Sequence, residues 1–81
     1  MSVVKVAGGL RKMWPLVFEW DPIKATINQH KHGVMFEEAE TVFDDPFAVI
    51  FEDELHSENE LRQIIVGVSR INRLLMVCFT E

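Results

Sequence analysis

DPIKATINQHKHG, residues 21–33, predicts an α-helix with a marked beginning and a marked end. Asp21 is a good N-cap, and Pro22 suits the first helical position because the N–H that proline lacks would have no helical partner there. Gly33 can adopt the left-handed conformation that follows many helices. The last turn is basic, and the helix dipole favours positive charge at that end. The stretch therefore predicts one helix, from which the neighbouring elements can be placed.

The spacing of apolar residues predicts which faces of the helices are buried. Ile23 and Ile27 are four residues apart, so they share one face of the first helix. Phe36, Ala39 and Phe43 repeat at helical spacing and predict a second helix. Glutamates stand in its first turn, and the Asp-Asp-Pro that follows ends it. Both helices are thus expected to cover a common core.

Short apolar runs bounded by polar residues predict strands. One precedes the helices at Phe18–Trp20, and three follow them at Phe47–Phe51, Leu61–Ser69 and Leu74–Thr80. Asn72 can supply the positive φ for the turn between the last two. The order β-α-α-β-β-β predicts an α+β domain with an antiparallel sheet. The residues expected in its core are Ile23, Ile27, Phe36, Ala39, Phe43, Val49, Ile65, Leu75 and Val77.

Length and composition limit the classes of protein. The chain has 81 residues, which favours one domain, and Cys78 is its single cysteine, so no disulfide forms within it. No apolar run approaches the roughly 18 residues of a membrane span, and a cytoplasmic location is the default expectation. The net charge of −5 by itself argues against nucleic-acid binding. However, bases cluster in Lys24–His32 and Arg62–Arg73, apart from the acids, so a basic face remains open.

Several polar residues have both a chemical and a structural interpretation. Lys31 and His32 can hold a phosphate and move a proton, or simply cap the helix. Trp20 can stack on a base or anchor the core. His56 lies in an acidic loop and is otherwise a solvated loop residue. No second cluster of histidine or cysteine accompanies these residues, so no zinc site is expected.

Three arginines accompany the third predicted strand and its turn. Arg62 and Arg70 are eight residues apart, which places them on the same face of a regular strand. With Arg73 they can bind phosphates. Alternatively, their charges can prevent other strands from pairing with an exposed edge. Joined to the family resemblance given below, the same-face argument leads us to expect His32 and Arg62 on one exposed concave surface.

The sequence contains KHGV-x-FEEA after E-W-D-x-x-K. With this motif as the most specific part, residues 18–81 resemble the BrnT toxins, RelE-like ribonucleases of type II toxin–antitoxin pairs. The matching residues are Phe18-Glu19-Trp20-Asp21, Lys24, Asn28, Lys31-His32-Gly33-Val34, Phe36-Glu37-Glu38-Ala39, Val42-Phe43-Asp44-Asp45-Pro46, His56-Ser57, Glu60, Arg62, Gly67, Ser69, Arg73-Leu74-Leu75, Val77 and Phe79-Thr80-Glu81.

The resemblance implies a RelE-like fold with two N-terminal helices packed on an antiparallel sheet. It implies RNA cleavage without a metal or cofactor, and neutralisation by a BrnA-type antitoxin. Carried onto this chain, it implies catalytic roles for Lys31, His32, Arg62 and Arg73. The RNA-binding residues implied beside them are Trp20, His56 and Arg70.

The chain departs from the family pattern at both ends. Residues 1–17 are expected to form an N-terminal extension, and residues 18–81 a domain that lacks the family's basic C-terminal strand and helix. The alternative function is therefore a non-catalytic remnant that binds an antitoxin or itself. Ser2–Val6 is expected as an edge strand. The strand Leu74–Thr80 needs a cover, and we favour a second copy of the chain over Ser2–Val6, which predicts a homodimer.

Overall fold

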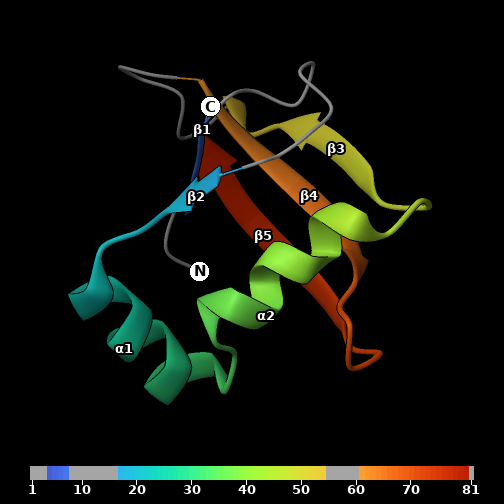
Figure 1. The fold of residues 1–81 in the computed structure, drawn as a ribbon. Helices are drawn as coiled ribbons and strands as arrows, with labels where there is room; N and C mark the ends of the chain where they lie inside the picture. Colours follow the sequence, from blue (N-terminus) through green and yellow to red (C-terminus); the bar gives the residue numbers. More distant parts are fainter. Residues whose placement is uncertain (1–3, 8–16, 55–60, 81) are drawn as a thin grey trace.

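The computed structural model describes residues 4–7, 17–54 and 61–80. These residues form five strands, two α-helices and one 3-10 helix (Figure 1). In chain order they are β1 (Val4–Ala7), β2 (Val17–Glu19), α1 (Pro22–His32), α2 (Phe36–Glu40), the 3-10 helix η1 (Thr41–Asp44), β3 (Val49–Glu52), β4 (Arg62–Val68) and β5 (Leu74–Thr80). The class is α+β, as the sequence predicted.

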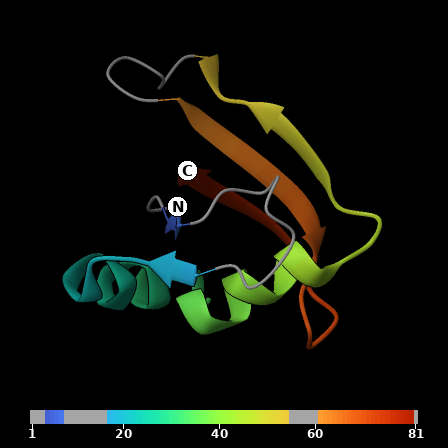
Figure 2. The same cartoon turned by 45° about the horizontal axis from the view of Figure 1, so that its top comes forward.

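The strands form one sheet in the order β2-β1-β5-β4-β3. Neighbouring strands are antiparallel except for β1 and β5, which run parallel with Val4 opposite Phe79. The expected order β-α-α-β-β-β therefore lacked one strand. The helices lie on one side of the sheet, as Figure 2 shows from a second direction.

The N-terminal strand corrects two expectations. An edge strand was expected at Ser2–Val6, but β1 lies inside the sheet, between β2 and β5. The exposed edge expected on β5 is likewise covered by β1 and not by a second copy. Because β1 is hydrogen-bonded on both sides, these two pairings offset the entropy lost when the segment becomes ordered.

The first helix begins and ends where the sequence predicted. The Asp21 carboxylate accepts a hydrogen bond from the Ile23 N–H at 2.9 Å. Gly33 has a φ of 68°, and its N–H donates to the carbonyl of Gln29. The expected buried face was wrong, since Ile23 is 71% and Ile27 55% exposed. A polar residue takes the buried position of α1: Asn28 is buried and donates to the Val34 carbonyl at 3.1 Å.

The core lies between α2, η1 and the central strands. Its buried side chains are Phe36, Ala39, Val42, Ile65, Val77 and Phe79. Phe43 and Leu75 pack against them from partly buried positions, and the Phe43 ring meets that of Phe79 edge-on at 5.0 Å. Val49 was wrongly expected in this core. It is 61% exposed because it lies on edge strand β3 and points away from the helices.

A glycine lets the end of η1 approach the sheet. A Cβ added to Gly67 would lie 2.9 Å from the Ala48 Cβ and 3.0 Å from a Val42 methyl carbon. Next to it, the Asp45 carboxylate accepts from the N–H groups of Val68 and Phe47 at 2.8 and 2.9 Å. Those two hydrogen bonds lower the Asp45 pKa, with Val68 making the larger contribution. This contact sets the position of the helices over β4.

We predict that Phe36→Ala destabilises the chain by about 3–5 kcal/mol, because the fully buried ring leaves a cavity in the core. Phe47→Ala is the matched control, since Phe47 is 87% exposed, and we expect a change of under about 0.5 kcal/mol. Urea unfolding of both variants measures the difference. Equal losses would show that the core has been assigned incorrectly.

Candidate functional site

A charged pair joins the helices to the turn between β4 and β5. The Arg73 Nε donates to Glu38 Oε2 at 2.9 Å, and its Nη2 donates to Glu38 Oε1. The same Nη2 donates to the carbonyl oxygen of Gly33 at 3.1 Å. One guanidinium therefore contacts both α2 and the residue that ends α1. It fixes the end of α1 against the β4–β5 turn.

Hydroxyl groups complete the connection between α2 and the turn. The buried Ser69 donates from its Oγ to Glu38 Oε2 at 2.7 Å and accepts from the Arg73 N–H at 3.3 Å. Thr41 donates to the Glu38 carbonyl and accepts from the Arg70 N–H at 2.8 Å. Polar contacts thus hold the backbone of this turn at both of its arginines.

The electrostatics of the pair follow from these contacts. The hydrogen bond from Arg73 is the main cause that lowers the Glu38 pKa, and the hydrogen bond from Ser69 adds to it. Partial burial opposes this effect, while the positive charge of Arg70 supports it. Glu38 in turn raises the pKa of Arg73. Glu38 is therefore a carboxylate at neutral pH and balances much of the charge of Arg73.

Basic residues at the end of α1 and in the β4–β5 turn flank this contact, and we call them the basic end. They are Lys31 and His32, the last two residues of α1, together with Arg70 and Arg73 from the turn. All four residues are exposed. Among the described residues, Glu38 is the carboxylate that forms a salt bridge here, and it pairs with Arg73. The positive charges of Lys31 and Arg70 are thus available to an anion.

The structure does not bring every candidate residue to the basic end. Arg62 opens β4 opposite Thr80, whereas Arg73 lies beyond the other end of the strand. At about 3.3 Å per residue, β4 separates these two ends by about 20 Å. The expected meeting of His32 and Arg62 is therefore not observed. Arg62 is half-buried and has a polar contact within the chain.

Trp20 and His56 are the remaining candidates. The Trp20 ring packs edge-on against Phe36 with centroids 5.6 Å apart, which is the core-anchor alternative. It also lines a pocket of about 200 Å³ at the start of α1 and α2. His56 lies outside the described residues.

Sequence reasoning missed the polar roles of Glu38, Ser69 and Thr41, because no local spacing connects residues about 30 positions apart.

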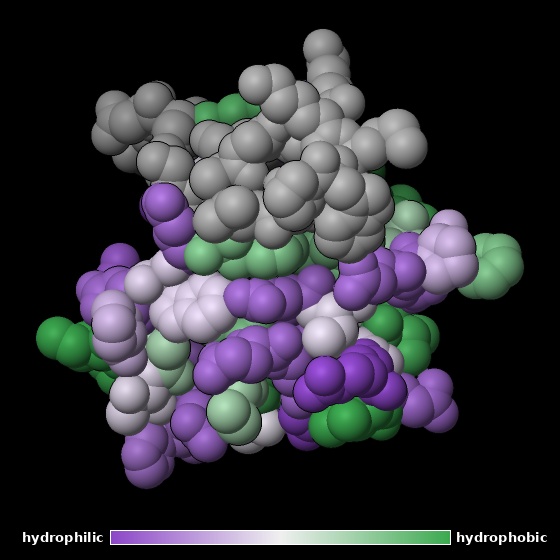
Figure 3. All heavy atoms as spheres, in the orientation of Figure 1, coloured by the Kyte–Doolittle hydropathy of each residue, from purple (hydrophilic) through white to green (hydrophobic). Residues whose placement is uncertain are grey.

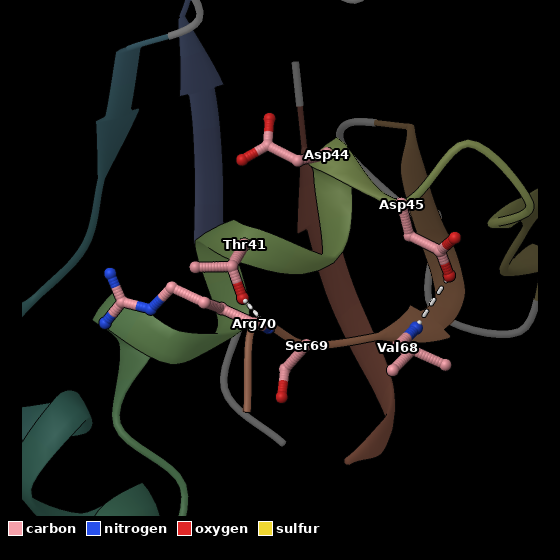
Figure 4. Close-up of a pocket in the computed structure, with 6 residues that line it drawn as sticks. All are labelled: Thr41, Asp44, Asp45, Val68, Ser69 and Arg70. Carbon is pink, nitrogen blue, oxygen red and sulfur yellow. Dashed lines mark hydrogen bonds between the residues drawn. The ribbon is translucent and has the colours of Figure 1, made fainter. Parts of the chain in front are cut away.

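A second pocket, of about 420 Å³, lies beside the basic end (Figure 4). It is lined by Thr41, Asp44, Asp45, Val68, Ser69 and Arg70. The Arg70 side chain extends away from Asp44 and Asp45 (Figure 4). The pocket therefore offers carboxylates on one side, with the basic end on the other.

Two classes of feature are not found in the part of the chain that is described. No three histidine, cysteine, aspartate or glutamate side chains are grouped so that they could hold a metal ion. No described helix has the length and apolar character needed to cross a membrane.

The face that carries the helices is largely hydrophilic, with hydrophobic side chains in separate patches (Figure 3).

Comparison with known proteins identifies a family. The family described as "Ribonuclease toxin, BrnT, of type II toxin-antitoxin system" matches residues 20–81. This match includes α1, α2 and strands β3 to β5, and with them the whole basic end. No curated protein and no solved structure matches the chain.

We predict that Glu38→Gln lowers the stability at neutral pH, because it removes the partner of Arg73. The sign of the pH dependence follows from the lowered Glu38 pKa. The wild-type stability from this group is present above the ordinary pKa of 4.5 and is lost as the pH falls through the lower folded value. The variant should therefore lose less stability than wild type on acidification.

Thermal unfolding from neutral pH to below pH 4.5 measures this difference. Glu37→Gln is the control, since Glu37 is its exposed neighbour on the same helix. If both variants follow the wild-type pH profile, the contact between Glu38 and Arg73 does not stabilise the fold.

Proposed function

Because the chain belongs to the BrnT family of type II toxin–antitoxin ribonuclease toxins, we propose that its basic end binds the RNA backbone and cleaves it without a metal. The observation that supports this most is the hydrogen bond that Arg73 Nη2 donates to the Gly33 carbonyl oxygen at 3.1 Å. It holds Lys31 and His32 beside the β4–β5 turn that carries Arg70. The end of α1 and the β4–β5 turn, which both carry basic residues, are therefore held together.

The reaction needs three contributions from the protein. A base removes the proton of the 2′-OH, whose oxygen attacks the adjacent phosphorus. Cations stabilise the negative charge that develops on the phosphate, and an acid protonates the 5′ oxygen as its bond to phosphorus breaks. The products are a 2′,3′-cyclic phosphate and a free 5′-hydroxyl. No oxidant or metal is required by this balance.

We assign the proton transfer to His32, because imidazole changes its charge near neutral pH. Lys31 and Arg70 contribute positive charge to the phosphate. Arg73 has a side chain that is 43% exposed, so we assign it phosphate contact as well as the positioning of α1. Arg62 lies about 20 Å away along β4. We assign it contact with a phosphate further along the RNA chain. Trp20 and His56 are proposed as contacts to bases.

The family also supports a protein partner, since a type II toxin is neutralised by an antitoxin. We propose a BrnA-type antitoxin and a cytoplasmic location, where the RNA substrate is found. Binding of the antitoxin keeps RNA from the basic end in this proposal.

The alternative is a non-catalytic protein that retains antitoxin binding. Two observations favour it: the net charge of −5, and the neutralisation of Arg73 by Glu38. Phosphate binding depends on net local positive charge and on salt. The two functions differ in whether the purified chain cleaves RNA.

We predict that the purified chain cleaves RNA in the presence of EDTA and leaves 2′,3′-cyclic phosphate ends. His32→Ala should slow the reaction by about 10²–10⁴-fold, which is the usual contribution of a general acid or base. Arg70→Ala should weaken RNA binding and reduce its salt dependence. Gel assays of product formation and binding measure these effects.

Matched controls separate the site from general charge. His30→Ala removes the other histidine of the same turn, and Lys24→Ala removes an exposed cation from the first turn of α1. Both should leave the rate within about twofold if surface changes of this kind are nearly neutral. RNA that stays intact with every preparation of the folded wild type would favour the non-catalytic alternative.

A further inference from the structure

The side of the sheet that faces away from the helices is apolar and open to solvent. Strand register places its side chains in adjacent rows, Val49–Val66–Met76 and Phe51–Ile64–Cys78. Val49 is 61%, Phe51 46% and Met76 56% exposed. We call these six residues the outer face. An exposed apolar patch that spans three strands is typical of an interaction surface.

The edge of the sheet next to this face is also open. β3 is the last strand in the order of the described sheet, and its one partner there is β4. All four of its residues are exposed, and Val49, Ile50 and Phe51 carry no charge that would oppose another strand. An edge with these properties accepts an added strand, whose alternate side chains extend the adjacent face.

Acidic residues stand on both sides of this edge strand. Asp44 precedes it, and Glu52, Asp53 and Glu54 end it and follow it. Asp44, Glu52 and Glu54 are exposed. The pocket of about 420 Å³ that includes Asp44 opens where β4 ends, opposite the start of β3. A partner for this edge therefore needs an apolar centre and positively charged ends.

We propose that an extended segment of the antitoxin binds as an added strand along β3, with apolar side chains on the outer face. Lysine or arginine residues at its two ends face Asp44 and Glu52–Glu54. This inference rests on the proposed function, because membership of the toxin family provides the antitoxin. Beyond the proposed function, the inference specifies which surface of the toxin the antitoxin contacts and which residue types the bound segment carries.

Charge decides between this partner and a second copy of the chain. Two copies paired through β3 would bring together molecules that each carry a net charge of −5 and acidic residues at both ends of the strand. Like charges placed opposite each other in a sheet are destabilising. A segment with basic ends gains attraction at the same positions. Where the segment leaves β3 beside Val49, it reaches the pocket that Asp44 lines and that borders the basic end.

The test uses the full chain, co-expressed with the antitoxin of the same module, and measures affinity by calorimetry. Val49→Lys and Phe51→Lys place a charge in the outer face, and each should weaken binding by about tenfold or more. Ile23→Lys and Ile27→Lys are matched controls, because they make the same change at exposed residues of α1. The controls should bind as wild type does.

A second pair of variants tests the charge. Glu52→Lys should weaken binding and reduce its dependence on salt, whereas Glu37→Lys on α2 should not. Hydrogen exchange of the wild-type complex should show new protection in residues 49–52. This measurement needs no variant, so it remains decisive if a β3 variant fails to fold.

The proposed function and this inference fail separately. The β3 variants should cleave RNA at the wild-type rate when no antitoxin is present. If the antitoxin protects residues 49–52 while the free chain does not cleave RNA, the docking surface stands and the nuclease proposal fails. The docking proposal is overturned by an antitoxin that leaves residues 49–52 unprotected or binds the Lys variants normally. It is also overturned if light scattering shows a wild-type dimer that Val49→Lys dissociates.

Discussion

The contact between Glu38 and Arg73 is the constraint on which the basic end depends. Arg73 comes from the β4–β5 turn and contacts two groups, the Glu38 carboxylate of α2 and the carbonyl of Gly33, the residue at which α1 ends. Three elements that are distant in sequence are thus held by one guanidinium with a planar arrangement of donors. The same contact limits the charge of the site, because a carboxylate lies within it. In this BrnT protein, the contact that positions the basic end therefore also reduces its attraction for an anion.

Local signals in the sequence predicted local structure well. The helix limits at Asp21 and Gly33 and the turn at Asn72, with its φ of 64°, follow from caps and backbone preferences that act within a few residues. Burial was harder to predict. Ile23 and Ile27 have helical spacing but are exposed, because burial depends on which neighbour a helix meets, and Asn28 takes that position instead.

The positions of the candidate residues could be predicted in part for the same reason, while their roles stay predictions. Lys31 and His32 end a helix with recognisable limits, and Arg70 and Arg73 lie in the turn between two predicted strands. The separation of Arg62 from them could not be seen, since same-face alternation says nothing about which end of a strand meets α1. The structure separates two surfaces, the basic end and the apolar edge at β3 with acidic residues on both sides.

The parallel pairing of β1 with β5 has a consequence for how the protein is made. Val4 lies opposite Phe79, so β1 must wait for β5, a strand far along the sequence, before it can form this pairing. A growing chain on the ribosome can form α1, α2 and the β1–β2 pair. The sheet stays divided until β5 emerges, because β5 is the strand that pairs with both β1 and β4. Contacts of such large sequence separation also form late in folding, because closing a long loop costs entropy. The basic end, which needs Arg73, is therefore assembled only after the β4–β5 turn has been synthesised, and a shorter nascent chain lacks the contact that holds α1 against this turn.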